Sequence, residues 1–181
     1  MRQKYNIRTK GDKQVKRVVL AVICLILLIL DNSVVPFFSI MNGMPSILLC
    51  FAICFSIING RWEATIVGAF SGMLQDIFFY KYYGINALIN LFICLLASIV
   101  GENIFKNKKF IPVLSTFVLT ILKILIAMLI LYLAKVKVSL GYNILISAAY
   151  NMIIVFLIYS RVYKFSNKKY MKVQWKFNKD K

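Results

Sequence analysis

Apolar residues occur in long blocks separated by short polar or turn-forming stretches. A membrane-spanning helix needs about 20 mostly apolar residues, and six blocks reach or approach that length: 18–38, 45–59, 62–80, 85–105, 110–134 and 140–163. The second block is short. The stretch before it holds Pro36, an Asn-Gly turn signal and Pro45, typical of a broken helix end or an interfacial segment. The pattern predicts an all-α integral membrane protein folded as a six-span transmembrane helix bundle.

Composition supports a membrane protein over a soluble one. Hydrophobic residues make up 61% of the 181 positions, which is more than an ordinary soluble domain carries. The length suits a single bundle. We therefore expect a basic N-terminal segment over residues 1–17, the bundle over 18–163, and a tail rich in basic and aromatic residues over 164–181.

The distribution of charge predicts the orientation of the bundle. Lys and Arg number 23 against 6 Asp and Glu, and 19 of the basic residues fall in the two ends and in the connections on one side of the predicted spans. Only Lys81, Lys135 and Lys137 lie on the other side. Because basic residues are retained in the cytoplasm, both termini are predicted to be cytoplasmic.

The placement of the basic residues also indicates what they bind. Basic residues gathered beside membrane spans fit anionic lipid headgroups better than nucleic acid. The tail "KKYMKVQWKF" alternates Lys with aromatic and apolar residues. This pattern is typical of a segment lying on an anionic membrane surface, and the alternative is a solvated, disordered tail.

Small residues recur along the third predicted span at every fourth position, at Gly60, Ala64, Gly68 and Gly72. On a helix this spacing forms a seam that lets another helix approach closely, which matters in lipid because lipid supplies no hydrophobic drive for helix association. The seam is predicted to pack against a helix of the same bundle or of a partner protein.

Two opposite charges lie within predicted spans at comparable depth. Asp76 is roughly 21 Å from the start of its span and Lys123 roughly 20 Å from the start of another, at 1.5 Å per residue. A single charge inside a membrane costs about 3 kcal/mol or more, so the two side chains are predicted to pair. In the alternative, Asp76 caps a neighbouring helix or reaches outer water, while Lys123 extends toward the membrane surface.

Polar amides mark the fourth predicted span. Asn86 and Asn90 are one helical turn apart and share a face, so they are predicted to form hydrogen bonds to other helices. At the cytoplasmic ends, Glu63 is expected to lie beside Arg61, and Glu102 is expected to be satisfied by Lys106 one turn away.

No catalytic set is recognisable in the sequence. The chain has no His, no phosphate-binding glycine loop and no nucleophile elbow. Its four cysteines lie inside apolar blocks and read as packing residues. We therefore expect neither an enzyme nor a bound cofactor or metal.

The stretch from Gly68 to Leu88 resembles the rod shape-determining protein MreD family. That family shows a small-residue helix, a Gly-Leu-Leu-x-Asp-like core, an aromatic or polar turn, and Gly-x-x-Ala-Leu. Here residues 72–76 read GMLQD and residues 84–88 read GINAL. Gln75 stands where the family usually has an apolar residue, and Pro45 matches a Pro at the start of the second span. Length, span number, basic ends and the closing helix extend the resemblance over most of the chain.

The resemblance implies a non-enzymatic scaffold of the bacterial cell-elongation complex in the cytoplasmic membrane. Such proteins work beside MreC, the actin-like MreB filament, and the RodA and penicillin-binding synthases of sidewall peptidoglycan. The alternative is the substrate-binding component of an energy-coupling-factor vitamin transporter. Those components dock through an Ala-x-x-x-Ala helix near the N-terminus, whereas Ala21 is followed four residues later by Leu25 here.

Overall fold

The fold is helical throughout the part of the chain that the structure, a computed structural model, describes. That part comprises residues 10–38, 43, 45–78, 84–102, 110–135, 143–168 and 171. Within it the helices, including the short 3-10 helix η1, are α1 (Lys10–Ser33), η1 (Val35–Phe38), α2 (Ile47–Asn59), α3 (Arg61–Phe78), α4 (Ile85–Glu102), α5 (Phe110–Leu133) and α6 (Asn143–Ser166). The predicted all-α class is confirmed over these residues.

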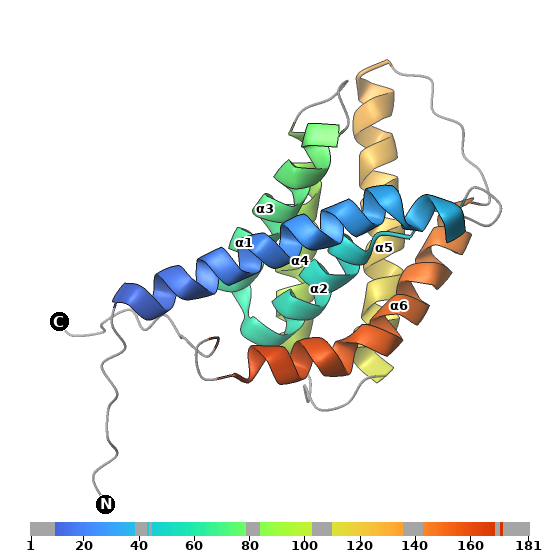
Figure 1. The fold of residues 1–181 in the computed structure, drawn as a ribbon. Helices are drawn as coiled ribbons and strands as arrows, with labels where there is room; N and C mark the ends of the chain where they lie inside the picture. The colour runs from blue at the N-terminus through green and yellow to red at the C-terminus, as the bar shows by residue number, and fades with distance from the viewer. Residues whose placement is uncertain are drawn as a thin grey trace, which may run out of the picture.

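The short helix α2 lies at the centre of the bundle. It packs against α1, α3, α4 and α6, and every residue from Leu48 to Ile57 is buried. Its sequence is apolar on all sides, as expected for a helix surrounded by others. Figure 1 shows α1 crossing the bundle beside α2 and α3, with α5 and the curved α6 packed together at the other side.

The helices differ in their ability to cross a membrane. Four segments are long and apolar enough: Gln14–Phe37, Ile85–Glu102, Phe110–Leu133 and Ile144–Ser166. In contrast, α2 has 13 residues and measures about 20 Å, less than the hydrocarbon thickness of about 30 Å. Helix α3 carries Arg61, Glu63, Gln75 and Asp76 among its 18 residues. The chain is therefore a multi-pass membrane protein, while the six spans and the cytoplasmic termini remain predictions.

The first helix begins earlier than the hydrophobic pattern indicates. It starts at Lys10 rather than Val18, so the predicted N-terminal segment is partly helical. It ends at Ser33 and is followed by η1, which agrees with a broken helix end in this region. Helix α2 begins at Ile47 rather than Pro45, because Ser46 caps it.

One residue beyond α6 returns to the core. Met171 is fully buried and belongs to the same hydrophobic cluster as Leu20 and Phe55. The rest of the tail sequence from Lys169 onward, for which a membrane-surface position is predicted, lies outside the described residues. At Met171 itself the side chain contacts the protein core.

Candidate functional site

The N-terminus of α2 is capped by side chains from other helices. Asp31 of α1 accepts hydrogen bonds from the backbone N–H groups of Ile47 (2.7 Å) and Leu48 (3.1 Å) and from the Ser46 hydroxyl (2.8 Å). Ser46 Oγ in turn accepts from the Leu49 N–H at 3.2 Å. The backbone donors that a helix leaves unpaired in its first turn are therefore satisfied by side chains of the protein. This capping ties the end of α1 to the start of α2.

Helices α5 and α6 contribute to the same cluster. The Ser46 N–H donates to Asn151 Oδ1 at 2.9 Å, and Asn151 Nδ2 donates to Thr120 Oγ1 at 3.3 Å. Asn151 is buried, as is Thr120. A buried polar group is stable only when its hydrogen-bonding atoms find partners, so this chain of bonds fixes α6 and α5 relative to the start of α2.

Gln75 of α3 bonds to the same cluster and links it to α4 and to a second residue of α5. Its Nε2 donates to Ser46 Oγ at 3.1 Å, while its Oε1 accepts from Asn90 Nδ2 at 2.9 Å and from Lys123 Nζ at 3.0 Å. Each of these three bonds joins α3 to a different part of the bundle: the N-cap of α2, helix α4 and helix α5. Asn90 is fully buried, and its Oδ1 has no hydrogen-bond partner within the described segments. Through its amide nitrogen Asn90 of α4 bonds to a residue of another helix, Gln75 of α3.

The structure does not show an ion pair between Asp76 and Lys123, the pairing predicted from their depth. Asp76 instead caps α4, accepting hydrogen bonds from the N–H groups of Gly84 (3.1 Å), Asn86 (3.0 Å) and Ala87 (2.9 Å). Lys123 donates to Gln75. Similar depth brings two side chains to one level of a bundle, but their directions around the helix axes decide whether they meet. The alternative that Asp76 caps a neighbouring helix therefore fits the geometry.

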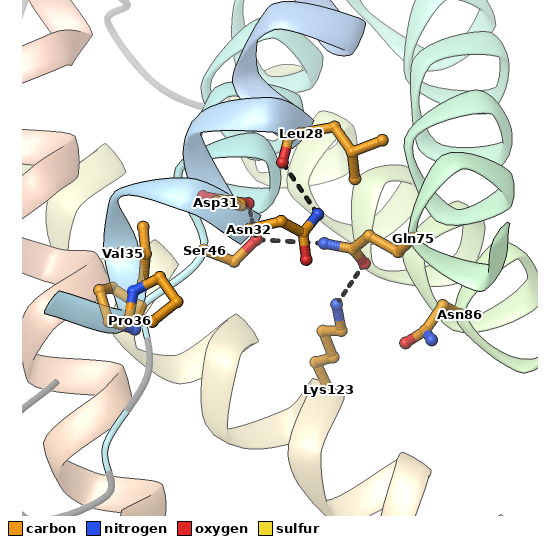
Figure 2. A pocket seen from close by; sticks show the side chains of 10 residues that line it. Leu28, Asp31, Asn32, Val35, Pro36, Ser46, Gln75, Asn86 and Lys123 are labelled. Atoms are coloured by element: carbon orange, nitrogen blue, oxygen red, sulfur yellow. Dashed lines mark hydrogen bonds between the residues drawn. The ribbon is translucent and has the colours of Figure 1, made fainter. Parts of the chain in front are cut away.

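Asp31, Ser46, Gln75 and Lys123 line a cavity of about 410 Å³. Figure 2 shows the cavity between the end of α1, the start of α2, the end of α3 and the middle of α5. Six of its ten lining residues are polar or charged. The lining consists of Leu28, Asp31, Asn32, Val35, Pro36, Pro45, Ser46, Gln75, Asn86 and Lys123. We call this region the cavity end of the bundle.

The opposite end of the bundle carries directly paired charges. Lys16 of α1 pairs with Glu63 of α3 at 2.6 Å, and both side chains are nearly buried. Arg61 of α3 forms two hydrogen bonds to Glu102 of α4, at 2.9 and 2.7 Å, in an exposed position. We call this region the paired-charge end. Glu63, predicted to lie beside Arg61, pairs with Lys16 of α1 instead. Glu102 pairs with Arg61 of α3, and Lys106, its predicted partner, lies outside the described residues.

The small-residue seam is filled from within the bundle. A Cβ atom added to Gly68 would lie 2.9 Å from the Asn90 carbonyl oxygen, and one added to Gly72 would collide with the backbone of Ala87. Ala64 is fully buried. Gly60 differs, because it is the link between α2 and α3, with a φ of 88° and open space beside it. Of the two predicted readings, packing against a helix of the same bundle is what the described residues show for Gly68 and Gly72.

Several residues of the site were not singled out in the sequence. Asp31, Ser46 and Asn151 lie far apart in the chain, and each looks unremarkable at its own position. Gln75 did carry a signal, as the departure from the apolar residue expected beside Asp76. The described part of the chain holds no group of three or more His, Cys, Asp or Glu residues arranged to hold a metal. The arrangement is suited to recognising polar or charged groups.

The helical bundle with a polar cavity between its helix ends defines a multi-pass membrane protein with a polar interior site. A model of the family described as rod shape-determining protein MreD matches residues 12–169, nearly the whole chain. The chain belongs to the MreD family. No curated protein and no solved structure gives a significant match to it. Membership places it in the bacterial cytoplasmic membrane, with a role in determining rod shape.

Proposed function

We propose that this chain is a non-enzymatic scaffold of the cell-elongation complex, which helps to control sidewall peptidoglycan synthesis by binding partner membrane proteins. The observation that carries the proposal is the family match over residues 12–169. The expected partner is an MreC-like membrane protein, and through it MreB filaments and the RodA and penicillin-binding synthases. Family membership favours this role over the vitamin-transporter alternative.

The packing of the bundle bears on where a partner would bind. Gly68 and Gly72 already contact α4, so a partner helix at that face would have to displace it. Apolar side chains are exposed instead along one side of α1, among them Val18, Val22 and Leu25. In a membrane these side chains meet either lipid or another protein. A partner of the scaffold is therefore expected at outward-facing helices.

The experiment that tests the function is removal of the gene from its host cell, with the wild-type gene returned as the control. A scaffold predicts loss of rod shape on removal and co-purification of an MreC-like protein with a tagged, functional copy. Nutrient uptake should be unchanged. Normal shape combined with loss of uptake of one vitamin would establish the transporter alternative instead.

The orientation belongs to the same proposal. Both termini are proposed to be cytoplasmic, with Lys135 and Lys137 outside, and the basic ends are proposed to contact anionic lipid. In intact cells an impermeant thiol reagent should label a Cys introduced at Lys137 and leave one at Lys108 unlabelled, in a background where the native cysteines are replaced. The reverse labelling would invert the bundle in the membrane.

A further inference from the structure

The charges around the cavity are not equally matched. Asp31 has three hydrogen bonds to its two oxygens, from Ser46, Ile47 and Leu48. Among the residues with a described position, Lys123 has one hydrogen-bond partner, the neutral amide oxygen of Gln75. The carboxylate is thus matched by the start of α2 and by a hydroxyl, whereas no acid of the described segments contacts the ammonium directly.

The second acid near the cavity does not correct this imbalance. Asp76 accepts three backbone N–H groups of the first turn of α4. Neither Asp31 nor Asp76 forms an ion pair with Lys123 among the residues that the structure describes. Hydrogen bonds require contact at about 3 Å, so neither acid satisfies a donor of the ammonium. A lysine ammonium has three donors, so two of them are left to face the cavity.

A second side chain with unused donors lines the same cavity as the ammonium. Asn86 lines the cavity, and Figure 2 shows its carboxamide turned toward the space that the Lys123 side chain enters. The backbone N–H of Asn86 is taken by Asp76, while no hydrogen bond of its side chain occurs among the residues that the structure places. Asn32 lines the same space and donates its Nδ2 to the Leu28 carbonyl. An ammonium and an amide with unused donors form a site complementary to negatively charged oxygen.

We propose that the cavity binds an anionic oxygen group, a carboxylate or a phosphate, through Lys123 and Asn86. The volume of about 410 Å³ lies within the range of roughly 300–1,000 Å³ that small-molecule sites occupy. A lysine recognises such a group as a point charge, which suits either anion. The group belongs either to the headgroup of an anionic lipid entering from the bilayer or to a small soluble molecule, and both present the same chemistry to Lys123.

The experiment uses the full-length protein in nanodiscs, with a separate arm for each source. In the lipid arm, phosphatidylcholine discs are doped with phosphatidylglycerol, and lipid retained by the released protein is counted by native mass spectrometry. In the soluble arm, the midpoint of thermal unfolding is followed in pure phosphatidylcholine discs as inorganic phosphate or acetate replaces chloride at constant ionic strength. Ligand that binds the folded state raises this midpoint. Binding in either arm identifies the source.

Two variants and a matched control locate the binding. Lys123→Gln should lower the affinity for the anion by about tenfold or more, as expected for a lost charged hydrogen bond. Asn86→Ala, which keeps the backbone N–H that Asp76 uses, should lower it by a smaller factor of about 3. Lys164→Gln removes the same charge from an exposed position of α6 and should leave the affinity unchanged. Lipid held only by the basic ends would respond to Lys164→Gln as much as to Lys123→Gln.

The outcomes that overturn the proposal are equally definite. They are an absence of anion binding in both arms, or an affinity in Lys123→Gln equal to that of the wild type. If Lys123→Gln does not yield a folded protein by circular dichroism, Asn86→Ala decides, and an unchanged affinity in that variant overturns the site. Cell shape is not a readout here, so failure of this proposal leaves the scaffold function standing.

Discussion

The two ends of the bundle handle charge in different ways. At the paired-charge end, Lys16 meets Glu63 and Arg61 meets Glu102 in direct ion pairs between helices. At the cavity end, Asp31 and Asp76 accept backbone N–H groups at the starts of α2 and α4, and Lys123 is left with an amide. The first arrangement joins helices charge to charge. The second joins each acid to the positive end of a helix.

The difference has a physical origin in the length of α2. The helix has 13 residues and covers about 20 Å, so it stops short of the thickness of a bilayer, about 30 Å. Its first turn therefore begins among the other helices, where its backbone donors need acceptors from the protein. Asp31 and Ser46 supply them, and the space above the helix is the polar cavity. A short central helix thus accounts for the cap formed by Asp31 and Ser46 and for the cavity beside it.

Both ends depend on close contact between helix backbones, and breaking that contact should have the largest effect. A side chain at Gly72 meets the backbone of α4 near the cavity, and one at Gly101 meets the backbone of Ile57 near the paired-charge end. Gly72→Leu and Gly101→Leu should each destabilise the bundle by about 3 kcal/mol or more, measured by denaturant unfolding in detergent. Met73→Leu, at a neighbouring exposed position of α3, is the control. Wild-type stability in either Gly variant would contradict the packing.

The buried ion pair should respond next. Glu63→Gln leaves the Lys16 ammonium nearly buried and without its acid, which costs about 3 kcal/mol in comparable sites. The double variant Lys16→Met, Glu63→Leu should recover much of that loss, because both charges are then absent. A loss in the double variant equal to the sum of the losses in Glu63→Leu and Lys16→Met alone would show that the two side chains contribute independently.

The cavity end should behave differently in the same kind of cycle. Asp76→Ala removes the acceptor for three N–H groups of α4 and should cost about 2 kcal/mol. Combined with Lys123→Met, the two effects should add to within about 0.5 kcal/mol, as for groups without direct contact. A coupling free energy as large as that between Lys16 and Glu63 would show that Asp76 and Lys123 do form the ion pair predicted from their depth.

The smallest effect is expected at the exposed ion pair. The side chains of Arg61 and Glu102 are 63% and 42% exposed, and exposed pairs contribute little because water screens them. Arg61→Ala should leave the unfolding midpoint unchanged at moderate salt. A clear loss of stability that disappears at high salt would assign this pair a larger role than its exposure indicates.

Hydrophobic pattern was a sufficient guide to most helices. Helices α3 to α6 begin within a few residues of their predicted positions, because the apolar blocks are bounded by charged residues or by residues that favour turns. The early start of α1 was missed because Lys, Arg and Gln form helix well, and apolar periodicity gives no signal over a basic stretch. The spacing of Gly68 and Gly72 predicted a close approach, but no pattern within one helix specifies which helix approaches.

The site was less accessible to sequence reasoning. Asn90 was expected to bond across helices and does so through Gln75. The hydrogen bond from Ser46 to Asn151 joins positions 105 residues apart, and no local pattern relates them. Asp31 lies at the end of an apolar block, where an acid is ordinarily exposed to water, so its role at the start of α2 became visible only in three dimensions.

The connection between α2 and α3 has a consequence for how the protein enters its membrane. Asn59 ends α2 and Arg61 begins α3, so Gly60 alone joins them, with its N–H bonded to Ser56 and its carbonyl accepting from Ala64. Alone, α2 is too short to be recognised by the insertion machinery as a span, and α3 carries charges that oppose its partitioning. Joined as a hairpin, they present one compact apolar unit. We expect the two to leave the translocon together, with the biogenesis of each depending on the other.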